Sequence, residues 1–105
     1  MKFLLVYYGG KMAQTPKEVE KSMAAWMKWF GSLGKALVDA GAPTMPGKVI
    51  SSAGTKSGTA GEAVTGYSII KTESLDSAVN MAKNAPLIAE GGKVAVYSLV
   101  DMPGM

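Results

Sequence analysis

The sequence of 105 residues has no cysteine and no histidine, and all eleven of its basic residues are lysines. Without these two residue types the chain lacks disulfides, thiol nucleophiles, the usual zinc ligands and the commonest general base. We therefore expect neither a metal nor a cofactor. Arginine, which makes bidentate contacts to phosphate and guanine, is also missing, and the lysines form no block. The composition predicts no nucleic-acid partner.

Long apolar runs are also missing. The run Phe3 to Tyr8 covers about six residues, whereas the apolar region of a signal peptide needs roughly 7 to 15. No segment approaches the roughly 20 apolar residues of a membrane span. We expect a cytoplasmic protein without a membrane partner. With 48% apolar and 18% charged residues, the composition is that of one globular domain, residues 1–105.

The first half of the chain predicts a strand and a long helix. Phe3 to Tyr8 is apolar at every position, so that both faces of this strand carry large side chains. Thr15 is a typical N-cap, followed by Pro16 at the first helical position and by Glu18, which can close a capping box. An apolar stripe continues the helix to about Ala40, where Gly41 and Pro43 end it.

The two tryptophans occupy different positions on this stripe. Trp26 falls at its centre, beside Met23 and Met27, and we expect all three side chains to fill the core. Trp29 is rotated about 60° toward the flank. Core edge, pocket wall and subunit interface all remain open for Trp29, because a large ring at the margin of a stripe is often half exposed.

The second half predicts strands over residues 48–51, 64–72 and 94–100, with a helix over residues 74–84 that Ser74 caps. Leu75, Ala78, Val79 and Ala82 should face inward from this helix. Residues 51–61 are rich in serine, threonine and glycine and contain no core residue. We interpret them as a long hairpin connection, with a ligand lid as the alternative.

The resulting order, β-α-β-β-α-β, predicts an α+β ferredoxin-like fold, in which a four-stranded antiparallel sheet carries two helices on one face. The other face is then bare, yet the first and last strands are apolar on both faces. A monomer would expose a large apolar patch, which isolated domains rarely tolerate. We therefore expect a homodimer that is formed through the sheet face.

Several segments resemble one family. They are Lys2-Phe-Leu-Leu-Val-Tyr, Trp26-x-x-Trp-Phe-x-x-Leu-Gly34, Ala40-Gly-Ala-Pro43, Gly66-Tyr-Ser-Ile-Ile, Ser74-Leu-Asp-Ser-Ala-Val79 and Gly91-Gly-Lys-Val-Ala-Val96. In this order they resemble the YCII-related family, which implies a dimeric α/β barrel. Members of that wider superfamily typically hold small ligands between the sheet and the helices, and several act as lyases, isomerases or oxygenases without a metal.

Two departures limit what this resemblance implies. The Asp-Gly-Pro-Phe signature of many relatives is replaced by Gly54-Thr55-Lys56-Ser57. The histidine of the proposed histidine–aspartate pair has no counterpart, because the chain has no histidine. The catalytic residues therefore stay unassigned.

Side chains that can position a small molecule form the candidate site. They are Tyr7, Tyr8, Trp26, Trp29, Ser51, Tyr67, Ser68 and Tyr97. A tyrosine can donate a hydrogen bond to an oxyanion, but with a pKa near 10 it is a poor base at neutral pH. The carboxylates Asp39, Glu62 and Asp101 lie at element ends and form no obvious pair. The simpler interpretation, in which these aromatic residues only fill the core and an interface, is favoured.

Three functions are consistent with these residues. The first is a small dimer that binds an apolar or aromatic molecule in a cleft between sheet and helices. The second is a cofactor-free lyase, isomerase or oxygenase that uses a tyrosine or a carboxylate. The third is a dimeric interaction module without a ligand.

Overall fold

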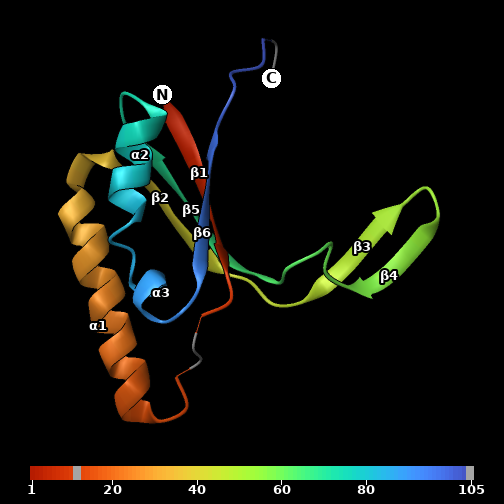
Figure 1. Ribbon diagram of the computed structural model, residues 1–105, viewed down its shortest axis with the longest axis horizontal. Helices are drawn as coiled ribbons and strands as arrows, with labels where there is room; N and C mark the ends of the chain where they lie inside the picture. Colours follow the sequence, from red (N-terminus) through yellow and green to blue (C-terminus); the bar gives the residue numbers. More distant parts are fainter. Residues whose placement is uncertain (11–12, 104–105) are drawn as a thin grey trace.

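The computed structural model describes residues 1–10 and 13–103 (Figure 1). Its elements are β1 (Lys2–Tyr8), α1 (Pro16–Leu33), the 3₁₀ turn η1 (Gly34–Ala36), β2 (Leu37–Pro43), β3 (Gly47–Ser51), β4 (Gly54–Gly58), β5 (Val64–Lys71), α2 (Leu75–Ala82), α3 (Pro86–Ala89) and β6 (Lys93–Ser98).

Four strands form the main sheet in the order β2-β5-β1-β6, and every neighbouring pair is antiparallel. The helices α1, α2 and α3 all lie on one side of this sheet (Figure 1). In the centre of the sheet, Leu5 stands opposite Ser68 of β5 and Val96 of β6. The predicted ferredoxin-like α+β fold is confirmed.

The two faces of β1 differ in burial. Phe3, Leu5 and Tyr7 point toward the helices and are almost fully buried, whereas the alternate residues Leu4 and Val6 are only half-buried. Because side chains of a strand alternate between the faces of a sheet, the second apolar row of β1 lies on the side without helices. The core therefore occupies one side of the sheet, and the other side is an uncovered apolar surface, here called the open face.

The start of α1 follows the predicted capping pattern. The Thr15 hydroxyl accepts a hydrogen bond from the Glu18 backbone N–H at 3.1 Å, and Pro16 occupies the first turn. The Glu18 carboxylate accepts from the backbone N–H of Gln14 at 2.8 Å, one residue before the cap. Both interactions satisfy backbone donors at the end where a helix cannot satisfy them itself.

The predicted end of this helix near Ala40 is wrong. The helix stops at Leu33, because Gly34 adopts a φ of 54°, which L side chains rarely accept. The next residues form β2, in which Leu37 pairs with Ile70 and Pro43 pairs with Gly66 of β5. Pairing with the buried strand β5 therefore outweighs the helical periodicity of Leu37 and Val38. No helix in the described ranges is long and apolar enough to cross a membrane.

The predicted strand over residues 48–51 exists as β3, but its expected place in the main sheet is wrong. It pairs instead with β4, with Lys48 opposite Ser57 and Ile50 opposite Thr55. The segment expected to be a hairpin connection thus contains a strand of its own. Together β3 and β4 form a separate two-stranded hairpin that projects from the body on the side opposite the helices (Figure 1).

The last part of the chain follows the prediction with small differences. Ser74 caps α2 by accepting from the Ser77 N–H at 3.1 Å, and Ala78 and Ala82 are buried. Leu75, expected to face inward, is 47% exposed, because it lies in the first turn of the helix. The turn expected after Pro86 contains the short helix α3, whose Leu87 enters the core.

Replacing Gly41 by alanine should lower the free energy of unfolding by at least about 2 kcal/mol. Gly41 has a φ of 74°, and a Cβ atom there would overlap the carbonyl oxygen of Tyr67 on the neighbouring strand. Urea unfolding at a fixed protein concentration measures the change. Gly31→Ala is the matched control, since nothing lies within 4 Å of its Cβ position and helix propensity should raise stability by about 0.5–1 kcal/mol. Equal stability of the two variants would contradict this explanation of the β2–β5 contact.

Candidate functional site

The structure distributes the predicted site residues over three places. Tyr7 and Ser68 point from strands toward the helices, where Trp26 and Trp29 of α1 meet them. Residues of the opposite parity lie on the open face, and these are Tyr8, Tyr67 and Tyr97. Ser51 lies in the projecting hairpin, at the end of β3. The residues therefore do not form one cluster.

A chain of two hydrogen bonds joins three strands on the helix side. The Tyr7 hydroxyl donates to Ser68 Oγ at 2.7 Å, and Ser68 Oγ donates to the Ala40 carbonyl oxygen at 2.7 Å. Burial raises the pKa of Tyr7, and the hydrogen bond with Ser68 offsets only part of this effect. Tyr7 therefore remains protonated at neutral pH, so that it acts as a hydrogen-bond donor and not as a base.

Aromatic rings continue from Tyr7 into α1. The Tyr7 and Trp26 rings meet edge-on at 5.1 Å, and the Trp26 and Trp29 rings at 5.8 Å. Trp29 is only 5% exposed, and its indole N–H donates to the Met81 carbonyl at 3.2 Å, which ties α1 to α2. Phe30 packs beside both tryptophans. These contacts favour a filled core between α1 and the sheet.

The inward face of α1 is rotated from the predicted stripe. Met23 and Met27, expected in the core, are 63% and 70% exposed, which makes that expectation wrong. Trp26 is half-buried, while Trp29 is the more deeply buried of the two tryptophans. The neighbours of α1 give the physical reason, because the Trp29 indole N–H bonds to Met81 of α2 and α3 also contacts α1, so that the flank with Trp29 faces inward.

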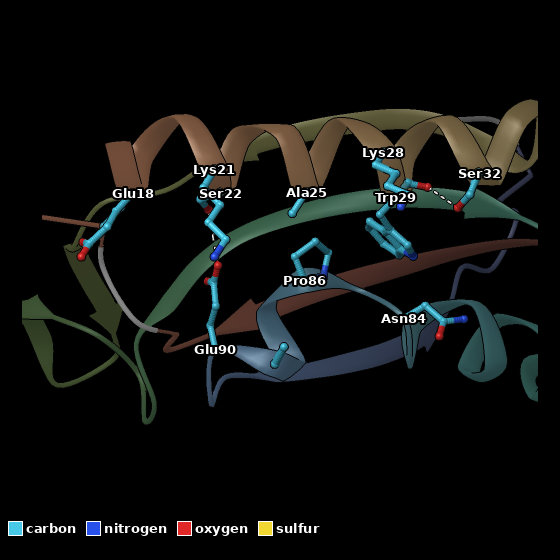
Figure 2. A pocket seen from close by; sticks show the side chains of 12 residues that line it. Glu18, Lys21, Ser22, Ala25, Lys28, Trp29, Ser32, Asn84, Pro86 and Glu90 are labelled. Carbon is cyan, nitrogen blue, oxygen red and sulfur yellow. Dashed lines mark hydrogen bonds between the residues drawn. The ribbon is translucent and has the colours of Figure 1, made fainter. Parts of the chain in front are cut away.

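A groove of about 660 Å³ lies between α1 and the segment 84–90 (Figure 2). Ala25, Trp29, Pro86 and Ala89 give it an apolar lining. Figure 2 shows Ala25 and Pro86 facing one another across its middle, with Trp29 beside them. Its volume falls within the range of small-molecule sites, about 300–1,000 Å³.

The two ends of the groove differ in charge (Figure 2). At one end, Glu18 and Glu90 flank Lys21, and Glu90 accepts a hydrogen bond from the Ser22 hydroxyl at 3.4 Å. At the other end lie Lys28, Ser32 and Asn84. Among the described residues, no carboxylate lies within ion-pair distance of Lys28. One end of the groove therefore presents an ammonium group that no described carboxylate neutralises.

The open face gathers the remaining tyrosines. Tyr97 stands across from Leu4, and Tyr67 across from Val6, so that both belong to the same apolar surface. Interaction with the Tyr97 hydroxyl is the main cause that raises the pKa of Tyr8. The Tyr8 hydroxyl is therefore protonated at neutral pH, like that of Tyr7.

A second hollow of about 400 Å³ lies near Tyr8 at the end of β6. Its wall contains the ion pair between Lys93 and Glu62, whose charged atoms are 2.8 Å apart. The carboxylate of Glu62 raises the pKa of Lys93. The opposite charges offset each other, and both side chains are largely exposed, so that this pair contributes little stability.

Reasoning from the sequence missed the polar side chains of the groove. Together with Ala25 and Trp29 they recur at helical spacing on α1. These polar residues are Glu18, Lys21, Ser22, Lys28 and Ser32. Residues three, four and seven apart share one face of a helix. The sequence signal that could have indicated the groove is therefore a second stripe on α1, made of small and polar residues around Trp29 and lying beside the apolar stripe.

Mutations of Tyr7 and Ser68 should show coupled effects on stability. Tyr7→Phe should cost about 1 kcal/mol, because Ser68 keeps its bond to Ala40. Ser68→Ala should cost more, about 2–3 kcal/mol, since it leaves the buried Tyr7 hydroxyl and the Ala40 carbonyl without their partner. A double-mutant cycle by urea unfolding measures the coupling, and the double variant should lose less than the sum. Additive effects would show that the two hydroxyls do not act as a unit.

Comparison with known proteins supports the fold. The YCII-related domain matches residues 1–103. Among solved structures, 5-chloro-2-hydroxyhydroquinone dehydrochlorinase (TftG) from Burkholderia phenoliruptrix AC1100, in complex with 2,5-dihydroxybenzoquinone, has a TM-score of 0.59 and 20% sequence identity. This similarity covers 95% of the present chain and 94% of that chain. No curated protein sequence matches the chain. Since the family match spans nearly all residues, the chain belongs to the YCII-related family.

Proposed function

We propose that the protein binds a small aromatic molecule in the groove between α1 and α3, and that it does so as a homodimer. The observation that carries the proposal is the groove itself, with an apolar middle next to Trp29 and polar groups at both ends. Ligand sites are typically concave and mostly apolar, with a few polar groups that fix orientation. The groove has all three properties.

The lining of the groove indicates how such a ligand would lie. A flat ring can occupy the space between Ala25 and Pro86, where small and rigid side chains leave room. An oxygen substituent at the edge of the ring would reach toward Lys28, which no described carboxylate neutralises. The Ser32 hydroxyl already donates to the Trp29 carbonyl at 2.6 Å, so the ammonium of Lys28 is the stronger free donor at this end.

The solved relative offers an independent argument for this class of ligand. TftG is described in complex with 2,5-dihydroxybenzoquinone, a flat ring that carries oxygen substituents. At 20% identity the likeness shows the fold alone, so it places no ligand in the present groove. It supports a proposal that the groove's own chemistry carries, and it suggests a probe for the test.

The enzymatic alternative has less support than binding alone. The pKa values of Tyr7 and Tyr8 are both raised, which makes these groups weaker candidates for a base. Asp39 accepts a hydrogen bond from the Gly41 N–H at 2.8 Å, and Glu62 is paired with Lys93. The interaction module without a ligand explains the open face but leaves the groove unexplained. We therefore assign binding and no reaction.

The homodimer follows from the open face of the sheet. Its side chains come from the three strands β1, β5 and β6, and they are Leu4, Val6, Tyr8, Tyr67, Ile69, Ala95 and Tyr97. A contiguous apolar patch of this kind typically marks an interface. A second copy that packs its own open face against this one would cover both patches in a single isologous contact. The elements that line the groove, α1 and α3, lie on the helix side of the sheet (Figure 1), so that the groove would stay accessible in such a dimer.

Ala25→Leu should weaken binding of 2,5-dihydroxybenzoquinone at least about tenfold, because the added side chain occupies the middle of the groove. Isothermal titration calorimetry measures the affinity. Ala24→Leu is the matched control, since Ala24 is an exposed helix residue outside the lining, and it should bind as the unmodified protein does. Lys28→Met keeps the aliphatic stem and removes the charge, and it should also weaken binding. Absence of binding to the unmodified protein at millimolar probe, or equal affinities for the two leucine variants, would count against the groove as the site.

Tyr97→Lys should raise the dissociation constant of the dimer about 10- to 100-fold, because it places a charge within a paired apolar surface. Tyr97 is 52% exposed in the single chain, so its replacement should leave the protomer folded. Sedimentation velocity over a range of concentrations measures the equilibrium. Met27→Lys removes an even more exposed apolar side chain from the helix side and should leave the dimer intact. A monomeric unmodified protein at all concentrations would refute the homodimer.

A further inference from the structure

The hairpin of β3 and β4, residues 47–58, is built as an arm. It forms its own two-stranded sheet and makes no substantial contact with any other element in the described part of the chain. The radius of gyration is 15.2 Å, whereas a chain of this length that is fully compact has about 13 Å. The arm extends from the end of β2 and returns to β5 on the side of the sheet opposite the helices (Figure 1).

The arm lacks the contacts that normally stabilise a hairpin. Ile50 is 80% exposed, and only Val49 and Gly58 are partly covered. An isolated two-stranded hairpin is at best marginally stable in water, because it has no third strand or helix to cover a face. A surface outside its own chain would therefore stabilise the arm.

The size of the open face indicates which surface the arm would pack against. Four strands about 4.8 Å apart and about six residues long cover roughly 400 Å². A standard stable interface buries about 800 Å² of accessible surface on each partner, and an arm that reaches over the second copy would enlarge the contact beyond the footprint of the sheet. One face of a five-residue hairpin adds roughly 160 Å². In a two-fold dimer, each copy both contributes an arm and receives one.

We propose that each arm lies against the second copy of this chain and completes the dimer interface, with Ile50 as its apolar contact. This inference rests on the sheet-face dimer proposed above. The arm projects on the side where the second copy would sit, so that sheet and arm together enclose it from two directions (Figure 1). The arm contains two lysines, Lys48 and Lys56, and no arginine, which is little charge for a nucleic-acid contact.

The first test compares neighbouring residues on opposite faces of the arm. Ile50→Asp should raise the dissociation constant of the dimer at least about tenfold, because it places a charge at a buried apolar contact. Ser51→Asp adds the same charge on the other face of β3 and should change this constant less than about twofold. Sedimentation velocity measures both, and circular dichroism checks that the protomers remain folded.

The second test removes the arm as a whole. Replacement of residues 47–58 by a short glycine-serine linker should leave a folded four-stranded sheet, since the arm barely touches the body, and should weaken the dimer at least as much as Ile50→Asp. An unchanged dissociation constant in both variants, alongside a dimer that Tyr97→Lys does weaken, would overturn the arm proposal and leave the sheet-face dimer standing. A protein that is monomeric without any mutation would overturn both.

A crosslinking experiment identifies what the arm touches. Because the chain has no cysteine, Ile50→Cys can be labelled at a single position with benzophenone maleimide and irradiated. The expected product is a covalent dimer, with the crosslinked peptide from the second copy identified by mass spectrometry of mixed light and heavy isotope-labelled protein. Crosslinks within one chain alone, or to a different macromolecule in a cell extract with none between copies, would contradict the proposal.

Discussion

Strand β1 carries large apolar side chains on both of its faces, and the sheet around it needs a cover on each side. The helices bury Phe3, Leu5 and Tyr7, and this packing fixes where α1, α2 and α3 lie. Leu4 and Val6 receive no such cover within the chain. Burial of apolar surface is the main favourable term in both folding and association. The same strand therefore dictates the core of the protomer and leaves the apolar surface through which the proposed dimer would form.

The groove depends on the same arrangement in a less direct way. The Trp29 ring extends from α1 into the core, and its indole N–H donates a hydrogen bond to the Met81 carbonyl. This bond holds the end of α2 close to α1, and the chain then turns through Pro86 into α3, which forms the opposite wall. A space remains because the facing residues at its middle, Ala25 and Pro86, are small or compact. The groove is thus a consequence of how the aromatic cluster fixes the helices.

The sequence predicts the parts of the fold that local chemistry decides. Thr15 and Ser74 cap their helices as expected, and β1, β5 and β6 lie where alternating apolar residues place them. The end of α1 was not predictable in this way, because helical periodicity continues through Leu37 while the decisive contacts come from β5. Tertiary pairing overrides local propensity there.

The candidate site shows the same limit. All eight candidate residues were expected at one cleft between the sheet and the helices, but the structure brings only four of them together there. These four are Tyr7, Ser68, Trp26 and Trp29. Tyr8, Tyr67 and Tyr97 lie on the other face, because one position along a strand reverses the direction of a side chain. The sequence does not give the position of α3 relative to α1, and so it does not reveal that Lys28 and Ser32 line a groove. Composition and periodicity predict single helices and strands, whereas a groove depends on how two of these elements lie relative to each other.

In the proposed dimer, assembly and ligand binding would use opposite sides of the protomer. The groove is formed by α1 and the segment 84–90 of a single chain, while the arm and the open face project away from it (Figure 1). A dimer closed through the sheets would carry its two grooves on its outer surfaces, each complete within its own chain. Ligand binding then needs no residue from the second copy. The packed rings of Tyr7, Trp26 and Trp29 connect the central strand of the sheet with the groove.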